Sequence, residues 1–375
     1  MSPFDFITKK HVVGFVAGLA YLPLALPTAV PFNLDFIPAA AVNGSVVTQF
    51  TSSAAGLDSP KQSAINSTVW DWWYFDVVGT DHNTSIVLVF SLALDTGFIG
   101  ASATIVPSVS ISGTFPNGTA YGYSTTAAGG AAVTTTSEGG ASGNWIGSGF
   151  SWVGSADMSQ YTLTIDAPAA GIEGTITLNS KAPAHYPCGP NVVGSNLQVG
   201  PNIGWANAIP DANALVNLQV GDTLLTYTGV GYHDKNWGNV PFPSGFNSWY
   251  WGHARFGNFS IVWFDFYDAA GVEHVSAYAS YLGQALAENC TLGSITVRPI
   301  GTTYPPTGDG NYPTGFTISI PLGALGTLTA TASVTRTILG VPFYERWIGT
   351  VSGSLNAGPP STGVGLWEEI NLLDL

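Results

Sequence analysis

Charged residues are scarce in this 375-residue chain, where Asp, Glu, Lys and Arg together make up 9% of the sequence. Nine Lys and Arg stand against 23 Asp and Glu, which gives a net charge of −14 at pH 7. A nucleic-acid surface needs clustered basic side chains to neutralise phosphates, and nine scattered ones do not provide it. The composition therefore argues against nucleic acid as a partner.

Motifs of several common catalytic chemistries are also missing. No serine stands in a Gly-x-Ser-x-Gly elbow, and the six histidines include no His-Glu-x-x-His pair. Two cysteines are too few for a zinc-binding cysteine cluster. Residues 229–231 read Gly-Val-Gly but lack the third glycine of a dinucleotide-binding fingerprint. We therefore predict neither a metal site nor a cofactor.

Helical stripes of apolar residues are absent from the sequence, whereas 46 glycines and 45% hydrophobic residues suit short strands and tight turns. Apolar runs and alternations predict an all-β protein of two tandem antiparallel barrels or sandwiches, whose closure would hide the strand edges. The strands are expected at residues 69–78, 85–94, 103–113, 145–153, 161–167 and 171–179, and then at 249–255, 260–267, 273–281, 293–299, 317–321, 327–338 and 347–355.

A proline-rich stretch separates the two groups of strands. Residues 181–213 contain five prolines, each of which blocks a regular hydrogen-bonded ladder. We therefore place a domain junction there, with one domain at residues 30–213 and the other at 214–375. Residues 30–65 show no period and are expected to form an extended lead-in to the first domain.

The N-terminus is typical of a secretory signal peptide, expected at residues 1–29. Lys9 and Lys10 precede an apolar stretch that begins at Val12. An uncleaved membrane anchor is the alternative, but Pro23 and Pro27 interrupt the apolar run before the roughly 20 residues that a spanning helix needs. We therefore expect secretion or residence in the secretory pathway.

Two further features fit that compartment. Six Asn-x-Ser/Thr sequons indicate a glycoprotein, and their asparagines are Asn43, Asn66, Asn83, Asn117, Asn258 and Asn289. Cys188 and Cys290 are the two cysteines of the chain. They could form one disulfide in an oxidising compartment, or both could stay unpaired, because sequence does not show whether they meet.

The first dense aromatic cluster is Trp-Asp-Trp-Trp-Tyr-Phe-Asp at residues 70–76. In a strand, side chains alternate between faces, so Trp72 and Tyr74 share one side with Trp70 and Asp76. Both faces are then aromatic. We expect one face to pack in a core and the other to line a cavity or a domain interface, although a strand buried between two layers would explain the tryptophans equally well.

The second cluster joins residues 229–239 to residues 249–255. It places scarce ionisable groups beside tryptophans, which is a composition typical of a site. Trp249, Trp251 and His253 should point the same way along one strand. The run His233-Asp234-Lys235 could belong to the site or could form a structural network at the junction, and the sequence leaves both readings open.

Together the two clusters resemble a superfamily of lipocalin-like proteins that includes bacterial carotenoid (hydroxyneurosporene) hydratases and fungal Diels–Alderases. The shared motifs are Trp-Trp-Tyr-Phe at residues 72–75 and Gly-Tyr-His-Asp-x-Asn-Trp-Gly at residues 231–238. The resemblance covers about residues 65–355 and implies two lipocalin-like β domains with a hydrophobic small-molecule ligand near their junction. In the hydratases, the position of Lys235 resembles a second His. The chain departs from the hydratase pattern there.

The resemblance also implies a reaction. The decalin-forming Diels–Alderases have an acidic residue where Tyr74 stands, so a different substrate is expected. A signal peptide with several sequons is more similar to the branch of hetero-Diels–Alderases that join a tropolone-derived quinone methide to humulene. Positions similar to pocket residues of the decalin-forming group are Tyr74, Trp251, Trp205 or Asn207, Ser112, Leu339 and Tyr344.

The expected mechanism is a cofactor-independent cycloaddition in a dry aromatic pocket. Trp72, Trp249 and Trp251 would hold the two reactants in one geometry, and Tyr74 or His253 would donate a hydrogen bond to a carbonyl oxygen. Two alternatives remain: a terpenoid hydratase or isomerase that depends on Asp234 or Asp265, and a carrier of hydrophobic ligands without turnover.

Overall fold

The computed structural model describes residues 32–136 and 139–375, so the expected signal peptide lies outside the described residues. Fifteen strands in the described ranges form one sheet. They are β1 (Phe32–Ile37), β2 (Trp70–Gly79), β3 (Ser85–Leu92), β4 (Pro107–Thr114), β5 (Ala120–Thr126), β6 (Ala131–Thr136), β7 (Ala141–Trp145), β8 (Phe150–Gly154), β9 (Gln160–Ala167), β10 (Ile172–Ser180), β11 (His185–Tyr186), β12 (Gly189–Pro190), β13 (Gln198–Gly200), β14 (Ile203–Val220) and β15 (Thr223–Gly238).

The remaining nine described strands form a second sheet. They are β16 (Phe246–Phe256), β17 (Phe259–Asp268), β18 (Glu273–Tyr281), β19 (Gln284–Asn289), β20 (Thr296–Ile300), β21 (Gly315–Pro321), β22 (Thr327–Val341), β23 (Tyr344–Leu355) and β24 (Ser361–Asn371). A single α-helical turn among the described residues, α1 (Phe242–Gly245), precedes β16. In the part of the chain with described structure, no helix is both long and apolar enough to cross a bilayer.

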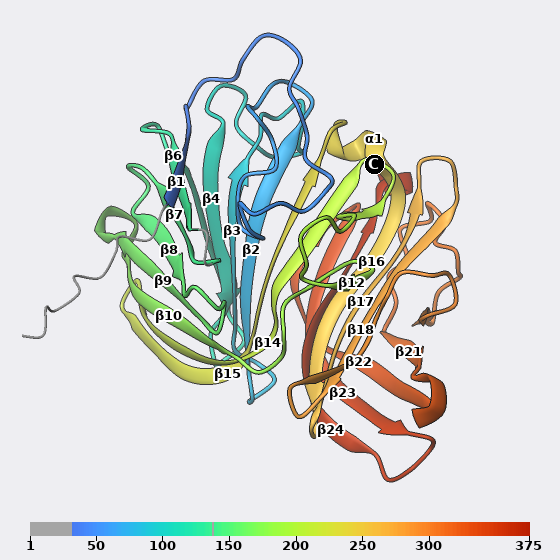
Figure 1. The fold of residues 1–375 in the computed structure, drawn as a ribbon. Helices are drawn as coiled ribbons and strands as arrows, with labels where there is room; N and C mark the ends of the chain where they lie inside the picture. The colour runs from blue at the N-terminus through green and yellow to red at the C-terminus, as the bar shows by residue number, and fades with distance from the viewer. Residues whose placement is uncertain (1–31, 137–138) are drawn as a thin grey trace, which may run out of the picture. The chain divides into compact units, whose positions relative to one another are not determined.

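Neighbouring strands run antiparallel, and both sheets curl (Figure 1). The main strand order is β1-β6-β7-β8-β9-β10-β14-β15-β2-β3-β4-β5 in the first sheet and β19-β18-β17-β16-β24-β23-β22-β21-β20 in the second. Curling lets each sheet enclose an apolar core of its own. The prediction of an all-β protein is therefore confirmed.

The passage between the sheets differs from the expected junction. Residues 213 and 214 both lie inside β14, which forms a long hairpin with β15 in the first sheet. The chain enters the second sheet at residues 239–245 instead. Pro210 is tolerated inside β14 because it lies at register shifts in the pairing of β14 with β15. The strands β10 and β11 also pair with β14, but at residues on either side of Pro210.

One expected strand is a hairpin in the structure. Residues 145–153 contain the end of β7, a turn and the start of β8. Gly147 and Gly149 have φ values of +88° and +84° within this turn, a region that glycine adopts without steric cost. The two glycines therefore reverse the chain where hydrophobicity alone suggested continuation.

Three apolar cores follow from strand parity. On β2, Trp73, Phe75 and Val77 pack inside the first sheet, whereas Trp72 and Tyr74 pack between the sheets. The strand β16 repeats the pattern, because its residues Trp249 and Trp251 face the first sheet and its other face packs inside the second. The expected parity of both strands is confirmed.

Polar contacts also join the sheets. His253 Nε2 lies 2.9 Å from both carboxylate oxygens of Asp76, and Arg255 Nε donates to both oxygens of Asp211 at 2.8 and 2.9 Å. Cys188 and Cys290 form a disulfide that links the β11–β12 region of the first sheet to the end of β19 in the second. Of the two readings that the sequence left open, the structure shows the paired one.

The disulfide closes a loop with a sequence separation of 102 residues. Replacing both cysteines by alanine should lower the free energy of unfolding by about 2–4 kcal/mol, because the unfolded chain regains loop entropy. Chemical denaturation of wild type and variant, each with and without reductant, measures this. Reductant should lower the wild-type midpoint and leave the variant unchanged; equal midpoints for the two oxidised proteins would contradict the prediction.

Candidate active site

A cavity of about 980 Å³ lies between the two sheets. Its walls come from β2, β3, β4, β5 and β15 of the first sheet and from β16, β17, β22, β23 and β24 of the second. It exists because the apolar faces of β2 and β16 approach each other, and two curled sheets do not close completely. The cavity is therefore built by both halves of the chain.

Aromatic rings form one side of this cavity. Trp72 and Trp249, from opposite sheets, lie with ring centroids 6.4 Å apart and an interplanar angle of 66°. Phe98, Phe242 and Phe264 extend the same surface. Such rings exclude water and offer broad apolar contact to a ring-bearing ligand.

Tyr74 provides a buried polar atom at the cavity. Its ring meets the ring of Trp251 edge to face at 5.3 Å, and its hydroxyl has no hydrogen-bond partner among the described residues. Burial raises the pKa of this phenol well above its usual value. Tyr74 therefore remains a neutral hydroxyl that is free to donate to a ligand.

Asp234 lies beside Tyr74, because the two residues are register partners on β15 and β2. Trp205 Nε1 and the Tyr232 hydroxyl both donate to its Oδ2, each at 2.7 Å. Burial raises the pKa of Asp234 to about 7 despite these two hydrogen bonds, which favour the ionised form. A proton on this carboxyl would reside on Oδ1, since Oδ2 already accepts two bonds.

An ion pair occupies another part of the wall. Arg346 Nε donates to Glu368 Oε2 at 3.0 Å, and the Tyr344 hydroxyl donates to the same oxygen at 2.6 Å. The Arg346 guanidinium lies 5.1 Å from the centroid of the Tyr74 ring. Glu368 neutralises Arg346, so this pair adds no net charge to the cavity.

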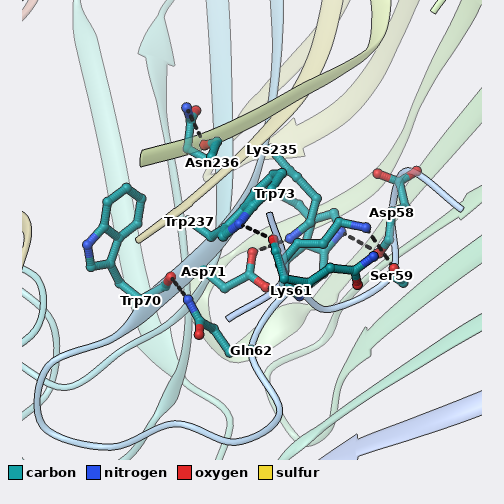
Figure 2. Close-up of polar contacts among 12 residues, drawn as sticks. Asp58, Ser59, Lys61, Gln62, Trp70, Asp71, Trp73, Lys235, Asn236 and Trp237 are labelled. Carbon is teal, nitrogen blue, oxygen red and sulfur yellow. Dashed lines mark hydrogen bonds and ion pairs between the residues drawn. The ribbon is translucent and has the colours of Figure 1, made fainter. Parts of the chain in front are cut away.

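The opposite face of β15 carries a separate polar cluster. His233 and Lys235 point away from the cavity, as strand alternation requires for neighbours of Asp234. Figure 2 shows Lys61, Asp71 and Lys235 converging. Asp71 accepts from the Lys235 ammonium and, at 2.7 Å, from the Lys61 backbone N–H. Burial and the Lys235 charge lower the pKa of Lys61 to about 7.

The two faces of β15 thus resolve the reading that the sequence left open. His233 contacts Asp58 at 3.2 Å, and Lys235 lies 3.8 Å from the centroid of the Trp73 ring, so both belong to a structural network. Asp234 lines the cavity. Successive residues of the run 233–235 therefore face the interior of the first sheet and the cavity alternately.

Most other predicted site residues line the cavity: Trp72, Tyr74, Ser112, Trp249, Trp251, Leu339 and Tyr344. Three predicted site residues do not. Trp205 lies behind Asp234, and Asn207 is buried between His185 and the His233 carbonyl. His253 is not part of the cavity lining: its Nε2 faces Asp76, its ring stacks on Tyr232, and its Nδ1 has no partner among the described residues, so its expected donor role stays a prediction.

Several residues that line the cavity were not predicted from the sequence. Arg346 and Glu368 come from the C-terminal strands β23 and β24, and Asn236 lies on β15. A usable indication existed for Arg346, since it is one of nine basic residues and stands in an aromatic strand. Within the described ranges, no three His, Cys, Asp or Glu side chains are grouped so as to hold a metal ion.

Comparison with known proteins identifies the family. The Diels-Alderase-like family model matches residues 36–287. The chain is 35% identical to the quinolone epoxide rearrangement protein asqO of Emericella nidulans, over 92% of this chain and 94% of that one. It is 34% identical to the corresponding protein penF of Penicillium thymicola, over 89% and 94%.

The chain therefore belongs to the Diels-Alderase-like family and is an enzyme of the pericyclase or cyclase kind. A crystal structure of CghA with Sch210972 superposes with a TM-score of 0.71 at 18% identity, covering 92% of this chain and 99% of that one. This likeness confirms the expected lipocalin-like fold.

Lys235→Met should lower the free energy of unfolding by about 3–5 kcal/mol, because it leaves the buried Asp71 carboxylate without the ammonium that donates to it. The double variant Lys235→Met/Asp71→Asn should recover most of this loss, since neither member of the pair is then charged. Urea denaturation gives both values, with the exposed Lys181→Met as the control. Equal destabilisation by the single and double variants would show that charge pairing is not the cause.

Proposed function

We propose that this enzyme cyclises or rearranges a hydrophobic substrate by donating hydrogen bonds from Asp234 and Tyr74 to one substrate oxygen. The observation that carries the proposal is the pairing of a carboxyl whose pKa is raised to about 7 with an unpartnered phenol on adjacent strands of one cavity. Two such donors in a water-poor site stabilise negative charge that develops on oxygen.

The step balances without an external reagent. With an epoxide, the Oδ1–H of Asp234 donates its proton as a C–O bond breaks, and a carbon of the substrate attacks the electron-poor centre. The attacking carbon then loses a proton, which returns to Asp234 and restores the acid. With a conjugated carbonyl, the same donors polarise the oxygen during a hetero-Diels–Alder reaction and no net proton moves. No cofactor is needed in either case.

Two substrate classes follow. The two relatives named quinolone epoxide rearrangement proteins, each similar over about nine-tenths of this chain, support an epoxide attached to a quinolone. The expected signal peptide and the six sequons motivate the second class, a tropolone-derived quinone methide that adds to humulene. The Asp234 acid favours the epoxide, because opening an epoxide demands proton donation and a cycloaddition does not.

Each substrate set is incubated with the purified enzyme in H₂¹⁸O, and product ratio, chirality and ¹⁸O content are compared with the spontaneous reaction. The proposal expects enzyme-dependent, stereoselective product without ¹⁸O. Incorporated ¹⁸O would indicate a hydratase instead. If the rate of formation and the chirality of the products are unchanged for both substrate sets, the protein is a ligand carrier without turnover.

Asp234→Asn and Tyr74→Phe should each lower kcat about 10²–10³-fold, because each removes one donor to the reacting oxygen. The half-buried Tyr227→Phe, outside the cavity, is the matched control and should stay close to wild type. A loss that appears only in KM for both active-site variants would contradict a transition-state role.

The rate of the wild type should fall as pH rises through about 7. The pKa of Asp234 is raised above its usual value, so the donating, protonated form is present below that pH and is lost above it. The residual rate of Asp234→Asn should be flat over the same range. A wild-type rate that increases across this range would rule out Asp234 as the acid.

We also propose that the enzyme is a secreted glycoprotein. The disulfide supports an oxidising compartment, and Asn43, Asn117, Asn258 and Asn289 are exposed, as glycan attachment requires. Asn66 and Asn83 are half-buried. Enzymatic deglycosylation of protein from a secreting fungal host should reduce its mass, chiefly through loss of glycans at the four exposed asparagines. An unchanged mass would contradict the proposal.

A further inference from the structure

The cavity wall formed by β3, β4 and β5 is chemically unlike the rest. Besides Val87 and Val89 on β3 and Tyr123 on β5, it carries a set of small hydroxyl side chains, namely Ser91, Ser108, Ser110, Ser112, Ser124 and Thr126. We call these six residues the hydroxyl wall. On β4 they alternate with Val109 and Ile111, which are buried in the core of the first sheet, so strand parity directs the serines to the cavity.

Strand register places the hydroxyl wall on one continuous face. Ser108 pairs with Ser91 on one side and with Thr126 on the other, and Ser110 pairs with Ser124. Directly paired residues of an antiparallel sheet lie on the same face, with Cβ atoms about 4.5–5.5 Å apart. Neighbouring hydroxyls can therefore contact one ligand group together.

These hydroxyls have no role in holding the described fold together. No side-chain hydroxyl of the six is hydrogen-bonded to another described residue, and the bonds that Trp145 and Thr125 donate to Ser91 and Thr126 end on backbone carbonyls. Serine is not a strong strand former, so the requirements of the sheet do not explain this set. Six unused donors and acceptors on one wall of a cavity are available to a ligand.

Charge narrows the class of that ligand. The ionisable groups that could carry charge at the cavity wall are Asp234, Arg346 and Glu368, on β15, β23 and β24, and none belongs to the hydroxyl wall. Arg346 is already paired with Glu368. An ionised ligand group at the wall would lack a counter-ion, whereas an uncharged group that both donates and accepts would match hydroxyls in both directions.

We propose that the hydroxyl wall is a binding subsite for an uncharged amide or hydroxyl group of the substrate. The part that concerns the reacting oxygen rests on the proposed function of Asp234 and Tyr74. Register gives the separation, because Asp234, Tyr74, Val89 and Ser110 are successive partners on β15, β2, β3 and β4. Three strand spacings amount to about 14 Å along the sheet, and curling shortens the direct path.

The substrate therefore has two ends. A reactive oxygen is held at Asp234 and Tyr74, an uncharged hydrogen-bonding group is held at the hydroxyl wall, and apolar carbon lies against Val89 between them. Fixing both ends orients the carbon that must react, which accounts for stereochemical control better than aromatic contact alone.

The test uses two neutral probes of similar shape, biphenyl-4-carboxamide and 4-methylbiphenyl, whose Kd values are measured by calorimetry. Wild type should prefer the carboxamide. In Ser108→Ala/Ser110→Ala/Ser124→Ala the Kd of the carboxamide should rise about tenfold, as expected for the loss of one or two hydrogen bonds, while the Kd of 4-methylbiphenyl stays within about twofold. Retained binding of 4-methylbiphenyl shows that the cavity is intact.

Three comparisons sharpen the result. Ser110→Thr/Ser124→Thr keeps the hydroxyls and should keep the preference. Ser142→Ala/Ser151→Ala, on β7 and β8 outside the cavity, should match wild type. Equal binding of both probes by wild type, an unchanged preference in the triple alanine variant, or loss of the preference in Asp234→Asn alone would overturn the proposal. Neither probe reacts, so the outcome is independent of whether the proposed activity is found.

Discussion

The whole arrangement depends on a strand that is apolar on both faces. β2 places Trp73 and Phe75 in the core of the first sheet and Trp72 and Tyr74 on the other side. The second surface must be covered, because exposed aromatic rings on this scale would be costly in water. The second sheet covers it with its own tryptophans, and the incomplete fit of two curled surfaces leaves the cavity.

Polar groups near this contact follow from the same constraint. A buried carboxyl must be paired or protonated. Asp76 and Asp211 are paired across the sheets, with His253 and Arg255 respectively. Asp234 receives two neutral donors and no cation, so burial raises its pKa. Asp76 and Asp211, which hold the sheets together, therefore differ from Asp234 in their hydrogen-bond partners and not in their burial.

Sequence reasoning succeeded where a local rule decides the outcome. Alternation along β2 and β16 predicted which aromatic residues converge, and Tyr74 and Trp251 do meet. It failed where pairing between distant segments decides. The register of Asp234 against Tyr74 joins residues 160 positions apart, and Arg346 reaches the cavity through the C-terminal hairpin. The bulges that admit Pro210 into β14 have no local signature, so the junction was placed too early.

Scarce charge also has a consequence for the chemistry. Arg346 and Glu368 cancel, so the protonation state of Asp234 sets the net charge of the cavity wall. Below pH about 7 the wall is neutral and suits a nonpolar substrate; above it, the wall carries one uncompensated negative charge. A nonpolar substrate that displaces water must therefore bind the protonated form better and, by linkage, raise the pKa of Asp234 further. The substrate itself thus favours the protonation state that the proposed reaction requires.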